Sequence, residues 1–361
     1  MMHLPRQRLR PSHCPSLALL ALAGALGCES TRPPTAPSTG PPLAMSANAR
    51  ATITLLNALP GATNMSETRG ISGAGQIVGR ASVPDFHRYA AIWEGSTDPT
   101  LLGDLPGVIG SMAWAITPNG TTVVGEASDG TQMLAIRWVK SAGSWVAEAL
   151  PHAPLTDSCQ ARDVTSDGSV IVGYCLGNFV SYAVFWKNGV PERLDPQHAT
   201  LAAVNDLGQA VGTIDGVAAR WDLSTGDFFS LGTLGGTESQ ALGINDAGAI
   251  VGWAALPSNA SRHAFIYTDK KGMVDLGTPD GPFSRAQAIN EAGQIVGEVT
   301  VGPNSAVHAF LWHKSKSLDL GAPDNNNNNP EFSSAFGLNE VGQIVGTSLV
   351  GSERGTLWTL P

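Results

Sequence analysis

The sequence has few charged residues, few aromatic residues and only four cysteines. Charged residues make up 14% and aromatic residues 6% of the 361 residues, whereas an average globular protein has about 25% charged residues. Glycine is abundant instead, with 42 residues, beside 24 prolines. The low charge content argues against a disordered chain. The formal net charge of −9 disfavours binding of nucleic acid or anionic lipid through bulk positive charge.

The sequence also lacks a long hydrophobic span and a helical pattern. No stretch after residue 50 keeps an apolar period of 3.6 residues, which disfavours a helical protein. The apolar run at 17–27 is too short to cross a bilayer as a helix. It follows Arg6, Arg8 and Arg10, so residues 1–27 are predicted to be an export signal peptide. Without them the chain keeps 18 basic and 30 acidic residues, a net charge of −12.

Cys28 closes this apolar run in the sequence Ala25-Leu26-Gly27-Cys28. The sequence resembles the cleavage box of bacterial lipoproteins, although that box usually has leucine first and a small residue second. An ordinary signal peptide cut nearby is the alternative. We predict lipidation at Cys28. Residues 28–50, rich in proline, serine and threonine, are then expected to form an extended tether between the lipid and a folded domain.

Seven related segments recur along residues 51–361. The clearest is INDAGAIVG at 244–252, and the first glycines of the seven lie at 75, 120, 168, 208, 248, 293 and 342. Asn, Asp and Gly tolerate the left-handed backbone of a tight turn, and the flanking β-branched residues favour extended chain. Each segment therefore predicts a β-hairpin. A Ca²⁺ loop is the alternative, but no copy has the alternating oxygen ligands that such a loop needs.

Each hairpin is followed by a strand with an aromatic residue and then by a leucine-glycine segment such as SLGTLGG at 230–236. Four short strands repeating every 40 to 50 residues predict an all-β fold, a seven-bladed β-propeller over residues 51–361. The chain begins with a leucine-glycine strand and ends with an aromatic strand. We therefore expect the N-terminal strand, residues 52–58, to pair with the last blade and close the ring. The tryptophans of the aromatic strands are expected to lie in the core.

Several motifs resemble those of the HAF family of bacterial extracellular repeats. They are HAF-[IL]-[YW] at 263–267 and 308–312, DLG at 275–277 and 319–321, and IN-[DE]-x-G-x-IVG. The match is best over residues 228–346 and looser over 51–361. The resemblance implies an exported repeat protein, and it carries over no catalytic residue.

The third repeat differs from the others at Cys159 and Cys175. Most other repeats have serine at the first position and a small residue at the second. The two cysteines lie symmetrically about Asp167 at the predicted hairpin tip, so an unslipped register places them opposite each other. In an oxidising compartment this arrangement predicts a cross-strand disulfide. Zinc is disfavoured because only two thiols are available in this repeat and no histidine lies at ligand spacing.

Four residues are candidates for ligand binding. Asp163 stands where the other repeats have glycine or alanine, on a strand expected to face the ring axis. It is either a binding or acid–base group or an aspartate paired beside Arg162. Trp114, Trp145 and Trp253 lie outside the aromatic series and are candidates for an exposed platform. No metal site and no cofactor are predicted.

Local catalytic motifs are missing, because the sequence has no Gly-x-Ser-x-Gly elbow, no His-Glu-x-x-His and no Walker loop. The leading hypothesis is a monomeric, non-enzymatic binding module of the bacterial cell envelope or the extracellular space. Its expected partner is an envelope protein or a glycan, not nucleic acid, and it meets the membrane only through the N-terminal anchor. Two alternatives stay open. One is a lyase or glycosidase with a site assembled from several blades, and the other is a carbohydrate-binding propeller.

Overall fold

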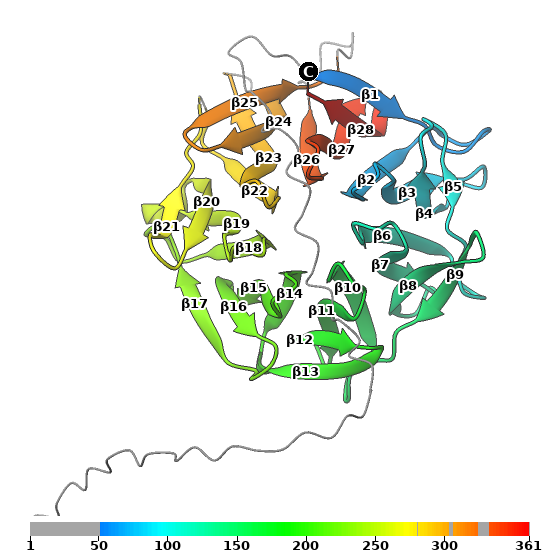
Figure 1. Ribbon diagram of the computed structural model, residues 1–361, viewed down its shortest axis with the longest axis horizontal. Coiled ribbons are helices and arrows are strands. Elements are labelled where there is room, and N and C mark those ends of the chain that lie inside the picture. The colour runs from blue at the N-terminus through cyan, green and yellow to red at the C-terminus, as the bar shows by residue number, and fades with distance from the viewer. Residues whose placement is uncertain (1–50, 280, 303–305, 324–331, 361) are drawn as a thin grey trace, which may run out of the picture. The chain divides into compact units, whose positions relative to one another are not determined.

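A computed structural model describes residues 51–279, 281–302, 306–323 and 332–360. These residues form seven antiparallel sheets of four strands each, arranged around a ring (Figure 1). The predicted seven-bladed β-propeller is thereby confirmed. The predicted signal peptide, the tether and Cys28 lie outside the described residues. No helix among the described residues is long and apolar enough to cross a membrane.

The strands of each blade follow one another along the chain, with the first strand innermost. Blade 1 is β2 (Ser66–Ile71), β3 (Ile77–Ser82), β4 (Arg88–Trp93) and β5 (Thr100–Leu101); blade 2 is β6 (Gly110–Ile116), β7 (Thr122–Ser128), β8 (Met133–Ser141) and β9 (Ser144–Ala149). Blade 3 is β10 (Ser158–Val164), β11 (Val170–Gly177), β12 (Val180–Lys187) and β13 (Val190–Gln197); blade 4 is β14 (Ala199–Val204), β15 (Gln209–Ile214), β16 (Val217–Asp222) and β17 (Phe228–Gly232); blade 5 is β18 (Ser239–Ile244), β19 (Ile250–Ala255), β20 (Arg262–Thr268) and β21 (Gly272–Asp275), with the short helix η1 (Pro257–Asn259) between β19 and β20. Blade 6 is β22 (Ser284–Ile289), β23 (Gln294–Val301), β24 (Ala306–His313) and β25 (Lys316–Gly321); blade 7 contains β26 (Ser333–Leu338), β27 (Gln343–Val350) and β28 (Ser352–Thr359).

Blade 7 takes its outer strand from the beginning of the domain. Strand β1 (Thr52–Leu56) pairs antiparallel with β28, from Thr52 opposite Thr359 to Leu56 opposite Gly355. The expected closure of the ring is confirmed, with a strand two residues shorter than the predicted 52–58. The strand ends because the next residue, Asn57, turns its backbone amide to the carbonyl of Thr97 in blade 1.

The polar residues of the repeated hairpins join neighbouring blades. The Asn245 side chain accepts a hydrogen bond from Ala249 within its own turn and donates one to the carbonyl of Asn290 in the next blade, both about 3 Å long. The same side-chain donation links Asn205 to Asn245, Asn290 to Asn339 and Asn339 to Ser72. The turn asparagines therefore close their turns and also hold blades 4 to 7 and blade 1 in order.

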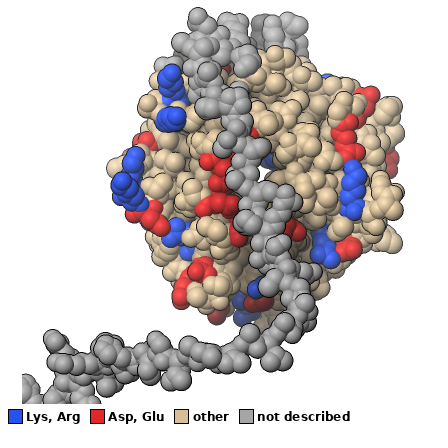
Figure 2. All heavy atoms as spheres, viewed as in Figure 1, with Lys and Arg blue, Asp and Glu red and all other residues tan. Residues whose placement is uncertain are grey.

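Acidic side chains form a second set of links at the same end of the ring. The backbone amide of Asp246 donates to Glu291, and equivalent bonds of 2.8 to 3.0 Å join the tips at Ser166, Asp206 and Glu291 to the acid of the next blade. Those acids are Asp206, Asp246, Glu291 and Glu340. Figure 2 shows acidic side chains gathered beside the central opening. This end of the ring is called the acidic mouth below.

The core lies between the blades. The tryptophans of the aromatic strands pack there as predicted, and Trp93, Trp138, Trp186, Trp221 and Trp358 are fully buried. In one cluster Trp138 of blade 2 contacts apolar residues of blade 1 such as Val78 and Ile92. Its indole nitrogen donates to the carbonyl of Gly103 at 2.6 Å. Burial of these side chains fixes each blade against the next.

Cys159 and Cys175 lie opposite each other on β10 and β11, with their Cα atoms 4.0 Å apart. They form a disulfide bond. The predicted pairing of the two cysteines is therefore present, although the expected unslipped register is wrong, because the register of β10 against β11 shifts by one residue at a β-bulge between Ala161 and Asp163.

Candidate functional site in the central channel

Every innermost strand carries a β-bulge at the same place. In β2, Thr68 pairs with Gly79 and Gly70 pairs with Val78, so Arg69 has no partner across the sheet. The same shift occurs in the innermost strands of the other six blades. A bulge turns the side chain of its extra residue to a new direction. The seven extra residues all line one cavity of about 400 Å³ at the centre of the ring: Arg69, Trp114, Arg162, Ala202, Leu242, Gln287 and Phe336.

The last glycine of each repeated segment makes this bulge possible. A Cβ atom added to Gly252 would lie 1.9 Å from the carbonyl oxygen of Gln240, which is far inside van der Waals contact. The glycines at 79, 125, 173, 212, 297 and 346 show the same approach, at 1.9 to 2.0 Å. The repeated glycine is therefore required by the close approach of two strands, and that approach sets which side chains reach the channel.

Two arginines of the channel are stacked on aromatic rings. The guanidinium of Arg69 lies 3.9 Å from the ring centre of Phe336 and 4.9 Å from that of Trp114. The guanidinium of Arg162 lies 3.6 Å from the same Trp114 ring. These contacts form a continuous row, Phe336–Arg69–Trp114–Arg162, across blades 7, 1, 2 and 3. Cation–π contact orients a guanidinium through its flat face, so the N–H groups at its edge stay available.

Three guanidiniums reach this cavity, from Arg69, Arg162 and Arg285. Arg69 donates to Glu67 at 3.3 Å. Among the residues that the structure describes, the side chains of Arg162 and Arg285 donate no hydrogen bond. They are attracted by Glu126 and Glu298 respectively. Arg162 and Arg285 therefore present unused donors to the channel.

The charges of these arginines repel one another. Burial is the main cause that lowers the pKa of Arg162, and the positive charge of Arg285 lowers it further. Burial likewise lowers the pKa of Arg69, and the charge of Arg162 adds to this effect. The repulsion shows that the guanidiniums share one poorly solvated space. A bound anion would reduce both the repulsion and the desolvation cost.

Asp163, a predicted site residue, lies in the wall of the same cavity. Its carboxylate accepts a hydrogen bond from the backbone amide of Val204 in blade 4, at 2.9 Å. Burial raises the pKa of Asp163 to about 6, and the backbone hydrogen bonds oppose that shift. One oxygen thus links blades 3 and 4, and the group stands beside Arg162 in the channel.

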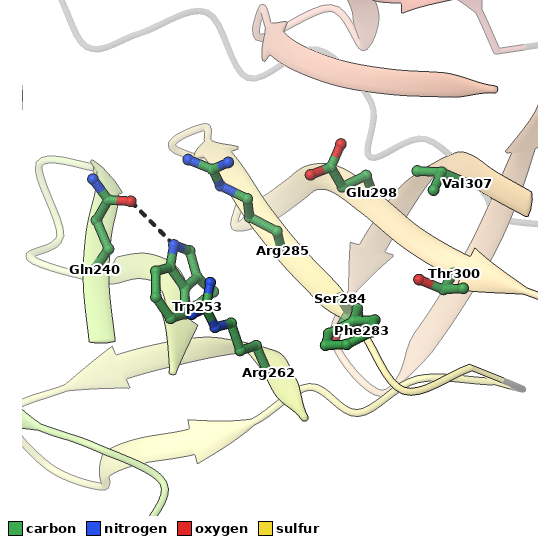
Figure 3. A pocket seen from close by; sticks show the side chains of 9 residues that line it. All are labelled: Gln240, Trp253, Arg262, Phe283, Ser284, Arg285, Glu298, Thr300 and Val307. Carbon is green, nitrogen blue, oxygen red and sulfur yellow. Dashed lines mark hydrogen bonds between the residues drawn. The ribbon is translucent and has the colours of Figure 1, made fainter. Parts of the chain in front are cut away.

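Figure 3 shows a second cavity, of about 390 Å³. It opens at the end of the ring opposite the acidic mouth. Its lining includes Ser284, the first residue of the innermost strand of blade 6, and Phe283 just before it, whereas the acidic mouth follows the end of that strand. Trp253 forms one wall, and its indole nitrogen donates to Gln240 at 3.0 Å. This end is called the Trp253 mouth below.

Arg262 and Arg285 complete the Trp253 mouth. The guanidinium of Arg262 stacks on Trp253, 4.5 Å from the ring centre, and pairs with Glu238 at 2.9 Å. Figure 3 shows Arg285 and Glu298 across the cavity from Trp253. Arg285 lines both this cavity and the central one. The two cavities thus share one lining residue.

The three candidate tryptophans lie in three different places. Trp253 lines the Trp253 mouth. Trp114 lies inside the channel between Arg69 and Arg162, so its ring faces are covered. Trp145 lies on the outer strand β9, packs against the core of blades 1 and 2, and has the ammonium of Lys140 5.4 Å from its ring centre. The structure therefore brings Trp114 and Asp163 together in one cavity and leaves Trp145 far from it along the blade.

The main functional candidates that the sequence did not reveal are Arg69, Arg162 and Arg285. The repeats contain one usable signal, because the residue before the small residue of the first strand is charged, aromatic or amide-bearing in five of seven blades. Strict alternation along a strand would have turned these side chains toward an adjacent blade and not into the channel. Only the bulge turns them inward.

Comparison with known proteins supports the fold and gives no family. No protein-family model matches the chain, and no curated protein matches its sequence. The resemblance to HAF repeats therefore rests on the motifs alone.

Solved structures with a similar fold include propellers of enzymes. One is an oligogalacturonate lyase in complex with manganese, with 11% identity and a TM-score of 0.58 over 86% of this chain and 97% of that chain. Another is the β-propeller domain of the Trilobed protease from Pyrococcus furiosus, with 13% identity and a TM-score of 0.56 over 83% and 95%. An acylaminoacyl peptidase has 12% identity and a TM-score of 0.56 over 82% of this chain and 51% of that chain. At such identities the likeness shows the fold alone, and the chain is a seven-bladed β-propeller related in structure to lyase and peptidase propellers.

Proposed function

We propose that the chain is an exported, lipid-anchored β-propeller that binds a ligand of the cell envelope at the Trp253 mouth and in the channel behind it. The observation that carries this proposal is the pair of cavities joined by Arg285. They present an indole face, two unpaired guanidiniums and several polar side chains in two cavities that share Arg285. A concave site with aromatic walls and a few placed polar groups is the usual form of a ligand pocket.

The side chains at the Trp253 mouth are held in place before any ligand arrives. Trp253 is bonded to Gln240 and stacked under Arg262, which is itself paired with Glu238. Such preorganisation lowers the entropy lost on binding. The repeated asparagine and acid links at the acidic mouth keep neighbouring blades in fixed register, so the residues from different blades that form the site keep their places.

Export and anchoring at Cys28 are supported by the sequence features of residues 1–50. The disulfide of blade 3 is in keeping with them, because disulfides persist in oxidising compartments. The tether of residues 28–50 would leave the ring free to meet an envelope protein or a glycan.

An enzyme of the lyase or glycosidase kind is the second candidate. The observation that favours it is Asp163, whose pKa is raised to about 6 beside Arg162 in the channel. A carboxyl group with such a pKa exchanges protons near neutral pH, as a general acid or base must.

A pull-down tests the binding proposal. Residues 51–361, which contain all seven sheets, would be incubated with cell-envelope extract, and the bound proteins and glycans would be identified. Trp253→Ala should lose the specific ligand, whereas the matched control Trp145→Ala, on the outer strand, should retain it. Equal recovery with both variants would refute the Trp253 mouth as the site. Turnover of the recovered ligand, lost in Asp163→Asn, would establish the enzyme instead.

A further inference from the structure

The central channel is rich in positive charge although the chain as a whole is acidic. Its cavity is lined by three arginines and one carboxylate, Asp163, whereas the formal net charge of the chain is −9. That carboxylate already accepts the amide of Val204. We propose that the channel binds an anion with at least two carboxylate or phosphate groups, held between Arg162 and Arg285. The inference rests on the proposed binding function and gives its ligand a chemical class.

Arg162 is prepared for such a ligand by the way it is held. Stacking on Trp114 at 3.6 Å fixes the plane of its guanidinium without using an N–H group. The planar fork of N–H donors at the edge of a guanidinium matches a carboxylate or a phosphate. An ammonium in the same place would be a point charge without this fork.

Arg285 presents its donors from another side of the channel. It is on β22 of blade 6 and Arg162 is on β10 of blade 3, strands that face each other across the ring opening in Figure 1. The Nε atom of Arg285 is buried and has no hydrogen-bond partner. This atom is shielded from the cavity, so the donors open to a ligand are the terminal N–H groups of the Arg285 guanidinium, which have no hydrogen-bond partner among the described residues. One acidic group contacts one arginine, and a ligand that reaches both needs two.

The carboxylates near these arginines do not fill the donor positions. Glu126 attracts Arg162, and its Oε2 atom is buried without a hydrogen bond. Glu298 lies opposite Arg285 on the neighbouring strand. Neither forms an ion pair within 4.0 Å of these arginines among the described residues. The two acids lower the net charge around the channel and leave the guanidinium N–H groups open.

Isothermal titration calorimetry of residues 51–361 with citrate and with pyrophosphate tests the inference. Citrate probes carboxylate recognition, pyrophosphate probes phosphate recognition, and acetate serves as the single-charge control. We expect saturable binding of citrate or pyrophosphate that weakens with added salt, and weaker binding of acetate. Arg162→Gln and Arg285→Gln should each lower the affinity about 10- to 100-fold, as expected when a hydrogen bond to a charged group is lost.

Two further variants keep the test decisive. Arg162→Lys keeps the charge and loses the fork, so it should bind more weakly than the wild type and more tightly than Arg162→Gln. Arg137→Gln, which removes a surface arginine paired with Glu148 on the outer strand, should bind as the wild type does. Circular dichroism would verify that each variant is folded.

Absence of saturable binding to both probes would overturn the inference, as would binding that Arg162→Gln and Arg285→Gln leave unchanged. If the probes fail while the pull-down still returns a ligand that Trp253→Ala loses, the anion site is refuted and the proposed function stands. If the probes bind and the pull-down returns nothing, the channel site is supported and the envelope partner is refuted.

Discussion

Glu67 offers the sharpest test of how the channel wall is stabilised. Its carboxylate is buried, with 2% of the residue exposed, and three arginines surround it. Arg69 lies at 3.3 Å and Arg88 at 2.8 Å, and Arg80 pairs with it as well. Glu67→Gln keeps the shape of the side chain and removes the charge. Because three guanidiniums then lose their buried counter-charge, we expect the free energy of unfolding to fall by about 3 to 5 kcal/mol.

The matched control is Glu148→Gln. Glu148 pairs with Arg137 at 2.7 Å, but its side chain is 44% exposed, against 3% for Glu67. An exposed pair contributes about 0 to 1 kcal/mol. Urea denaturation at pH 7 would measure both variants. A loss below about 1 kcal/mol for Glu67→Gln, equal to the control, would refute the importance assigned to this buried cluster.

The same variant has a defined pH dependence. Burial alone would raise the pKa of Glu67, but the charge and hydrogen bonds of Arg80, with smaller contributions from Glu353 and Arg69, lower it below 4.5. A pKa lowered in the folded state means that the stabilisation is present above pH 4.5 and is lost as the pH falls through the folded pKa. The stability difference between wild type and Glu67→Gln should therefore shrink in acid.

Four further changes have definite expected outcomes. Burial raises the pKa of Asp104 from 3.8 to about 6, so ionisation of Asp104 lowers the stability of the fold as the pH rises through 6. Asp104→Asn should raise the free energy of unfolding by about 1 to 2 kcal/mol at pH 7 after solvent screening, and should leave it unchanged below pH 3.8. Thermal melts that show a loss of stability at pH 7 would contradict this. Non-reducing peptide mapping should recover Cys159 linked to Cys175, and replacing both by serine should cost about 3 kcal/mol of unfolding free energy for a loop of this length; free thiols would contradict the register. Gly252→Ala should cost about 1 to 3 kcal/mol, because its Cβ would lie 1.9 Å from a carbonyl oxygen, and an unchanged melting temperature would show that the bulge is not required. Asp163→Asn should fold, because an amide oxygen can still accept from Val204; an unfolded product would assign the carboxylate a structural role.

The architecture could be predicted because the repeat contains its own alignment. Seven copies of a hairpin with glycine at a fixed place predict both the number of blades and the pairing of the two chain ends. The disulfide followed from the same symmetry, because Cys159 and Cys175 are equally distant from the tip at Asp167. These are properties of strand register, which local residue patterns specify well.

The composition of the channel could not be predicted because it depends on one extra residue in each innermost strand. A period of two places Arg69 and Arg162 on the opposite side of the strand from their neighbours, facing an adjacent blade rather than the channel. The bulge turns them inward, and the glycine opposite, such as Gly79 or Gly173, permits it. The meeting of Arg285 with these residues is a further consequence of ring closure, since blades 1, 3 and 6 are far apart in the chain.

The most direct measurement of the ligand site compares wild-type residues 51–361 with Arg285→Gln in the same envelope pull-down. Arg285 is the residue that lines both cavities, so its loss should affect a ligand at the Trp253 mouth and one in the channel alike. The wild type should retain a specific ligand that folded Arg285→Gln does not. Recovery of the same ligand in the same amount with both proteins would show that the site lies elsewhere on the ring.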